Sequence, residues 1–207
     1  MALGSYSELR TTIADYLARD GDIGFVNMIP SFVKLCETRM NRALRDLENE
    51  YVARLTPDEN GQALLPLGFR QLRMVNCEDS APGLEYLTPA EAESRYGDAS
   101  GGTPVAYSIV GQTLFLYPAS TTSVILSYYG EVPALSDSRE TNWVLEKHPD
   151  AYLFGSLVEA CLFAGMDDPR IAAWEQKFAA AIDDIRTSDR GARWGNARAQ
   201  VPGGVLA

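Results

Sequence analysis

Two residue patterns alternate along this 207-residue chain, and their order is the strongest constraint on its fold. Apolar residues recur every three to four positions near both ends, which is the period of an amphipathic α-helix. Between the ends, short apolar runs are separated by glycine and proline turns, as in β-strands. A helix with one apolar face needs a partner that covers this face. We therefore expect an α+β protein in which helices from both ends pack as one bundle and carry an antiparallel β-rich insertion.

The helical body is expected to comprise residues 1–50 and 141–186. A first helix is predicted over residues 5–19. A second is predicted from about Pro30 to Glu50, because proline is favoured in the first turn of a helix. In the C-terminal part, one helix has an apolar face too wide for a surface position, so it is expected at the centre of the bundle.

The second predicted helix carries charged residues beside its apolar stripe. They are Glu37, Arg39, Arg42, Arg45 and Asp46. This pattern is typical of a solvated helix face with ion pairs within the helix. The alternative is a wall that faces a neighbouring subunit.

The β-rich insertion is expected to comprise residues 51–140. A turn sequence at 58–61 separates two short strand patterns, 51–56 and 62–65, which predicts a β-hairpin. Further short strands follow, and one short helix with Thr88 as its N-cap interrupts them. Strands that are joined by turns rather than by helices pair antiparallel.

Residues 187–207 are predicted to form an extended C-terminal arm. The segment has four glycines, one proline and no periodicity. Its apolar residues are too few to offset the entropy of ordering it, so we expect another molecule to hold it. With three arginines and one aspartate, it is also the only segment of the chain with a net positive charge.

Composition excludes several classes of protein. The net charge is −10, with 28 carboxylates against 18 cations, which argues against a protein that grips a phosphate backbone. No apolar run approaches the ~20 residues that cross a bilayer, so no membrane partner is expected. The three cysteines lie far apart and form no CxxC pair, which favours a reducing compartment such as a cytoplasm over a disulfide framework or a zinc ribbon.

We predict no catalytic residue, no cofactor and no metal site. The single histidine, His148, is expected to cap or pack a helix. The aspartate pairs 167–168 and 183–184 are predicted to be solvated, and Cys36 and Cys161 to be packing residues on apolar helix faces. The alternative is a small hydrolytic enzyme that uses His148 with a nearby carboxylate.

One block is more specific than the rest of the sequence. It is Thr141-Asn142-Trp143-Val144-Leu145 followed by His148-Pro149-Asp150-Ala151-Tyr152-Leu153-Phe154-Gly155. Weaker segments precede it in the order Ile13-Ala14-Asp15-Tyr16-Leu17, Ile29-Pro30-Ser31-Phe32-Val33, Leu84-Glu85-Tyr86-Leu87-Thr88-Pro89 and Gly102-Thr103-Pro104. Together these segments resemble the head-to-tail adaptor proteins of tailed bacteriophages, a group that includes podovirus tail tubular protein A.

The resemblance implies a structural protein of the virion neck, at the head-tail junction. Members of this group assemble as a twelve-fold ring beneath the portal, so a homo-oligomer, a dodecamer, is expected here. The ring would connect the portal protein to a tail or nozzle protein. Genomic DNA would pass through its lumen without specific binding, since carboxylates repel phosphates and let the duplex slide.

In this interpretation the C-terminal arm docks on the portal. Arginine and tryptophan dominate the energetics of interfaces, which makes four residues of the arm its expected anchors. They are Arg190, Arg193, Trp194 and Arg198. The alternative within phage virions is another neck or tail-tube component whose arm holds a neighbouring copy.

Overall fold

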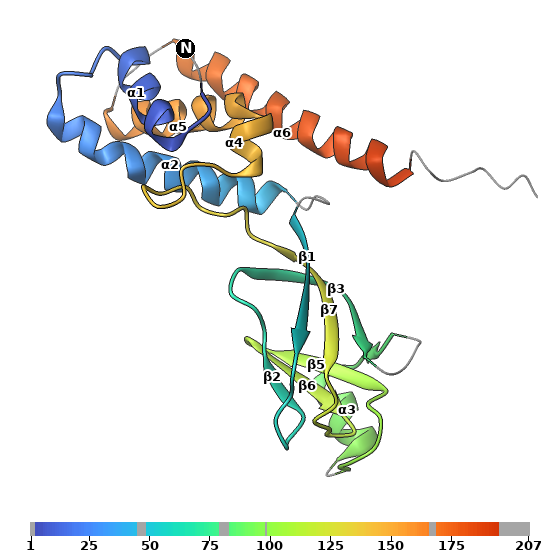
Figure 1. The fold of residues 1–207 in the computed structure, drawn as a ribbon. Helices are drawn as coiled ribbons and strands as arrows, with labels where there is room; N and C mark the ends of the chain where they lie inside the picture. Colours follow the sequence, from blue (N-terminus) through green and yellow to red (C-terminus); the bar gives the residue numbers. More distant parts are fainter. Residues whose placement is uncertain (1–2, 45–48, 79–82, 98, 166–168, 195–207) are drawn as a thin grey trace, which may run out of the picture. The chain divides into compact units, whose positions relative to one another are not determined.

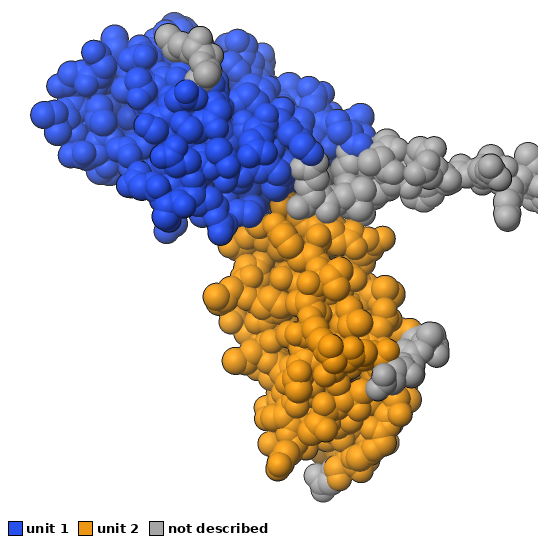
Figure 2. All heavy atoms as spheres, viewed as in Figure 1, with its two compact units in different colours: residues 1–48, 132–207 blue, residues 49–131 orange. Residues whose placement is uncertain are grey.

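The chain folds into two compact units, which Figure 2 shows in different colours. This computed structural model describes residues 3–44, 49–78, 83–97, 99–165 and 169–194, with only the backbone for 189–194. Unit 1 combines residues 1–48 with 132–207 and holds the helices of both chain ends, and unit 2 comprises residues 49–131 and holds the strands. The predicted α+β class, with helices from both ends in one bundle, is confirmed.

Unit 1 contains five helices within its described residues (Figure 1). They are α1 (Tyr6–Tyr16), α2 (Ile23–Ala43), α4 (Trp143–Lys147), α5 (Pro149–Phe163) and α6 (Arg170–Trp194). Helix α5 is central, as expected: its buried side chains share one apolar core with those of α1, α2 and α6. None of the described helices has the length and apolar character needed to cross a membrane.

Helix α2 begins earlier and ends earlier than the sequence predicted. Its N-cap is Asp22, whose carboxylate accepts a hydrogen bond from the backbone N–H of Phe25. This cap starts the helix at Ile23, so Pro30 lies inside the helix instead of in its first turn. Helix α2 ends at Ala43 rather than near Glu50, and strand β1 (Glu50–Leu55) begins at the predicted helix end.

Unit 2 is built from two sheets that share an apolar core. Their strands are β1 (Glu50–Leu55), β2 (Gln62–Leu64), β3 (Phe69–Cys77), β4 (Glu85–Tyr86), β5 (Ala106–Val110), β6 (Thr113–Tyr117) and β7 (Val124–Gly130). One sheet has the order β1-β7-β3 and the other β2-β6-β5-β4. All pairs are antiparallel except β4 with β5. Helix α3 (Pro89–Tyr96) has the predicted N-cap Thr88 and a complete capping box.

The predicted hairpin of residues 51–56 and 62–65 is wrong. Strand β1 pairs with β7 and β2 pairs with β6, so the two strands that flank this turn belong to different sheets. The turn itself forms, because the Asp58 carboxylate accepts hydrogen bonds from the backbone N–H groups of Asn60 and Gln62. A turn sequence thus predicts the reversal of the chain but does not decide which strands pair.

The segment that follows β7 belongs to the helical unit, although the sequence assigned residues 132–140 to the insertion. Val132 and Leu135 are buried in the core of unit 1. Two side chains one turn apart on α2 accept hydrogen bonds from this segment: Asn41 Oδ1 from Val132 N at 2.8 Å, and Glu37 Oε1 from Leu135 N at 2.7 Å. Helix α2 therefore fixes the path of the returning chain.

Candidate docking surfaces

The C-terminal arm begins as a helix. Helix α6 continues to Trp194, so residues 187–194 are helical and not extended as predicted. Adding residues to an existing helix needs no new nucleation, and alanine and arginine favour the helix while Gly191 costs only ~1 kcal/mol. The prediction used only the composition of residues 187–207, which contains no information about the helix that precedes them.

Three of the four predicted anchors lie in the last two turns of α6. They are Arg190, Arg193 and Trp194, whose spacing of three and four places them on adjoining positions of a helix surface. The fourth, Arg198, lies outside the described residues. The structure thus groups three anchors on one regular element.

Helix α6 is fastened to the bundle up to Arg186. The Arg186 guanidinium donates two hydrogen bonds to the carbonyl of Ala43, from Nη2 at 2.8 Å and from Nε at 3.2 Å. These bonds satisfy a terminal carbonyl of α2, and the cation lies at the negative end of that helix dipole. The last buried side chain that is described on α6 is Ile185. Figure 1 shows α6 running on past the end of α2.

A second fastening involves Arg39 of α2. Its guanidinium pairs with Glu159 of α5 and Glu175 of α6, and it lies 4.5 Å from the centre of the Phe178 ring. The predicted ion pairs within α2 are therefore wrong for Arg39, which joins three helices instead. These contacts hold α6 in place and leave its C-terminal turns beyond the end of α2.

A buried polar network lies between α2, α4 and α5. Glu37, which the sequence placed on a solvated face, is only 5% exposed, and its carboxylate accepts a hydrogen bond from the Tyr152 hydroxyl at 3.0 Å. Asn142 donates to that hydroxyl at 2.6 Å and to the carbonyl of Pro133 at 2.7 Å. Its Oδ1 accepts from the N–H of Leu145 and so caps α4.

Burial sets the protonation behaviour of this network. Removal from water raises the pKa of the Glu37 carboxyl, although the hydrogen bonds from Leu135 and Tyr152 oppose that effect. Burial also raises the pKa of Tyr152, and the nearby Glu37 carboxylate adds to this shift. The network links α2, α4 and α5 to one another, because Glu37, Tyr152 and Asn142 are hydrogen-bonded to each other inside the bundle. We call residues that link parts of the bundle by such hydrogen bonds joint residues.

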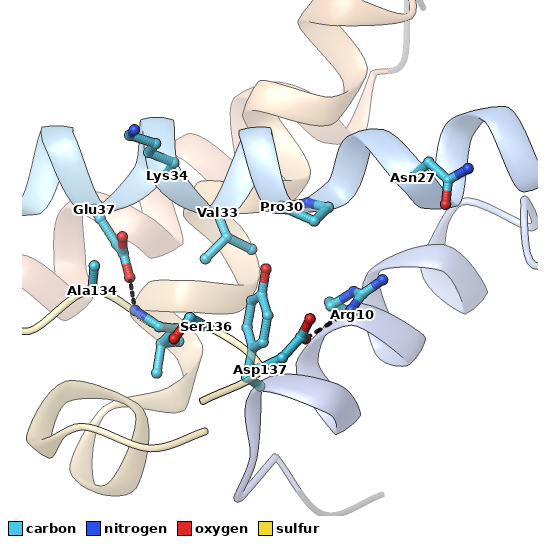
Figure 3. A pocket seen from close by; sticks show the side chains of 11 residues that line it. Arg10, Asn27, Pro30, Val33, Lys34, Glu37, Ala134, Ser136 and Asp137 are labelled. Carbon is cyan, nitrogen blue, oxygen red and sulfur yellow. Dashed lines mark hydrogen bonds and ion pairs between the residues drawn. The ribbon is translucent and has the colours of Figure 1, made fainter. Parts of the chain in front are cut away.

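A groove lies between α1, α2 and residues 134–137, and Glu37 of the network is one of its lining residues (Figure 3). Its volume is ≈650 Å³. The Arg10 guanidinium pairs with Asp137 at 3.3 Å and lies 5.6 Å from the centre of the Tyr6 ring. Burial raises the pKa of the Tyr6 hydroxyl, and the neighbouring Arg10 charge opposes this shift. Since Arg10 and Asp137 both line the groove and pair with each other, their charges neutralise one another there.

The block that carried the resemblance has a structural explanation. Asn142 caps α4, Pro149 is in the first turn of α5, and Tyr152 is fully buried in the network. Gly155 lies where α2 and α6 cross α5, and a Cβ atom there would be 2.4 Å from Cys36 Sγ. The block thus encodes helix packing.

The structure also places the cysteines and the histidine that the sequence predicted as packing or capping residues. Burial raises the pKa of the Cys36 thiol to about 12, so the thiol stays protonated and unreactive at neutral pH. His148 is the N-cap of α5 but forms no side-chain cap bond. Cys161 is buried in the core of unit 1. Among the described residues, no group of three His, Cys, Asp or Glu side chains is arranged to hold a metal ion.

Sequence reasoning missed Glu37, Asn41 and Tyr152 as joint residues. A signal for Glu37 exists, because it lies four residues after Val33 and three before Met40, on the buried stripe of α2. A carboxylate on an apolar stripe needs a buried partner. The identity of that partner is not encoded locally, since Tyr152 is 115 residues away.

Comparison with known proteins identifies a matching family. The family model described as "SU10 adaptor protein" matches residues 5–202. No curated protein gives a significant match. The matched range contains nearly the whole of both units and all four predicted anchors.

Proposed function

Because the chain belongs to the SU10 adaptor protein family of phage head-to-tail adaptors, we propose that it forms a ring beneath the portal and docks there through its C-terminal arm. The arm comprises the projecting turns of α6 and the residues after them. The ring joins the portal protein to a tail or nozzle protein, twelve copies being the number that the resemblance implies. Its role is structural, not catalytic.

The fastening of α6 is the observation that carries this proposal. Arg39 and Arg186 hold the helix against α2 and α5, and eight residues of α6 follow Arg186. At 1.5 Å per residue, this end is ~12 Å long. A rigid helix presents its anchors at a fixed position, which lowers the entropy lost on docking compared with a disordered arm.

Charge supports a DNA channel through the ring. The chain carries a net charge of −10, so the chain as a whole repels phosphates. A duplex that must slide through during packaging and ejection is not retained by such a surface. The basic arm is the exception, and in this proposal it is directed at the portal.

The docking role of the arm is tested by removing it. A chain truncated after Arg186 keeps every described buried side chain of α6, so it is expected to fold but not to bind purified portal rings. The double variant R190E/R193E is expected to fail in the same way. Reversing two exposed arginines elsewhere in unit 1, as in R42E/R139E, adds the same charge and is expected to leave binding intact.

Binding is measured by cosedimentation with portal rings, and helix content by circular dichroism. Full portal binding by the truncated, folded chain would show that the arm is not the docking element. Binding to a nozzle protein but not to the portal would favour the alternative, another neck or tail-tube component.

A further inference from the structure

One sheet face of unit 2 has no covering element among the described residues. The inner faces of both sheets pack against each other in a common core. On the outer face of the β2-β6-β5-β4 sheet, α3 covers one part, where Leu87, Ala92 and Ala106 form a small core. The described residues place no helix on the outer face of the β1-β7-β3 sheet, where Tyr129 at one end of the face is only 9% exposed. We call it the outer β1-β7-β3 face.

An apolar row crosses the middle of this face. Val52, Ser127 and Met74 are aligned on adjacent strands by the pairing register. Side chains that are aligned in this way point to the same side of a sheet. Val52 is 71% exposed and Met74 is 47% exposed, although both are large apolar residues on paired strands. Met74 lies next to Gly83, where a Cβ atom would be 3.7 Å from Met74 Cγ.

Ion pairs lie on both sides of this row. Arg54 on β1 pairs with Glu78 just beyond β3, and Arg73 on β3 pairs with Glu50 on β1, so each pair joins the two outer strands across β7. Arg73 is the extra residue of a β-bulge between Leu72 and Met74. The face therefore has an apolar centre and a rim of paired charges, which is the usual composition of a protein interface.

The charges of this face cancel, unlike those of the rest of the unit. Residues 49–131 contain four arginines, no lysine and ten carboxylates. Three of the arginines pair at this sheet, with Arg70 next to Glu131 as the third pair. Described carboxylates outside these pairs lie elsewhere, at the 58–59 turn, on α3, and on β4, where Glu85 pairs with Arg95 of α3. The outer β1-β7-β3 face is thus a neutral region on an acidic unit.

We propose that the outer β1-β7-β3 face binds a second copy of this chain. The inference rests on the proposed ring and names one of its contact surfaces. Two copies that each carry a charge of −10 repel each other, and they approach most easily through a surface without net negative charge. A closed ring of more than two copies needs two different surfaces on each copy, and this face is one of them.

A second apolar row offers a matched control. Leu64, Thr113 and Val110 are aligned in the same way on the other sheet, and Leu64 and Val110 are 75% and 51% exposed. The strands of that sheet contain no arginine, and its one ion pair among the described residues joins Glu85 of β4 to Arg95 of α3. Glu91 and Glu93, on the same helix, leave this sheet with a net negative charge. The neutral rim is what distinguishes the first row from the second.

The test compares V52E/M74E with L64E/V110E in the full-length chain. Each variant adds two negative charges at exposed strand positions of unit 2, so the effect on the stability of the fold should be similar for both. Circular dichroism and thermal unfolding check that both variants remain folded. Mass is measured by light scattering after gel filtration and by native mass spectrometry, over a concentration series and with purified portal rings.

V52E/M74E is expected to raise the concentration needed for copy-to-copy assembly by about tenfold or more, since it buries unpaired charge at the contact. L64E/V110E is expected to assemble as the unmodified chain does.

Unchanged assembly of V52E/M74E, or loss of assembly only in L64E/V110E, would overturn the inference while leaving the proposed ring intact. An unmodified chain that never assembles, even with portal, would remove the proposed ring and this contact together. A V52E/M74E variant that assembles but no longer binds the portal would assign the face to the portal instead.

Discussion

Gly155 allows the close helix packing that positions α6, and replacing it tests this role. An alanine Cβ at this position would lie 2.4 Å from Cys36 Sγ on α2 and 2.8 Å from the Phe178 ring on α6. Both neighbours are buried, and neither can move without displacing the core around it. Helix α5 would have to separate from both partners at once.

The expected magnitude follows from two opposing effects. Overpacking a dense core costs ~1–3 kcal/mol, and contacts on two sides favour the upper end of that range. Replacing glycine by alanine within a helix contributes ~1 kcal/mol of stability in the opposite direction. We expect G155A to lower the free energy of unfolding of unit 1 by ~2 kcal/mol. For a unit of this size, the midpoint of thermal unfolding falls by roughly 6 °C.

Tryptophan fluorescence provides a specific assay, because all three tryptophans belong to unit 1. G24A is the matched control: Gly24 is exposed in the first turn of α2, and a Cβ there meets only the Asp22 carboxylate, at 3.4 Å. This variant is expected to be as stable as the unmodified chain or more stable, by up to ~1 kcal/mol. A G155A chain that unfolds at or above the unmodified midpoint would refute the packing argument.

Two further predictions concern the buried network. The pKa of Glu37 is raised in the folded state, so its contribution to stability is present below the unfolded pKa near 4.5 and is lost as pH rises through the folded pKa. The stability of the unmodified chain relative to E37Q should therefore fall over this pH window, as measured by urea unfolding followed by fluorescence. A difference that stays constant with pH would contradict the prediction. N142A removes the cap of α4 and the two hydrogen bonds that Asn142 donates, so it should lower the free energy of unfolding by ~2–3 kcal/mol. S5A removes only the single cap bond of α1 and should cost ~1 kcal/mol. Equal losses of stability in the two variants would argue against a buried network at Asn142.

The sequence predicts the local elements of this protein better than their partners. The bundle of terminal helices, the central α5 and the α3 cap follow from periodicity and capping residues that act over a few positions. The β1–β2 hairpin was predicted wrongly because local turn chemistry does not determine pairing: β1 pairs with β7, more than 60 positions further along the chain. Long-range pairing depends on which faces can be buried together, and a single strand pattern does not contain that information.

The candidate docking surfaces also separate what local sequence predicts from what only the fold reveals. The predicted anchors Arg190, Arg193 and Trp194 follow from residue type alone. Their position on one helix depends on the continuation of α6 beyond Arg186, which binds the carbonyl of Ala43. The outer β1-β7-β3 face gave no signal in the sequence, since Val52 and Met74 lie on separate strands and are aligned only through Ser127 between them. Its neutral charge likewise arises from arginines and carboxylates 23 and 24 positions apart. Composition describes the chain as acidic except in residues 187–207, whereas the fold gathers paired charges on one face of unit 2. This neutral face is the one that we propose to bind a second copy.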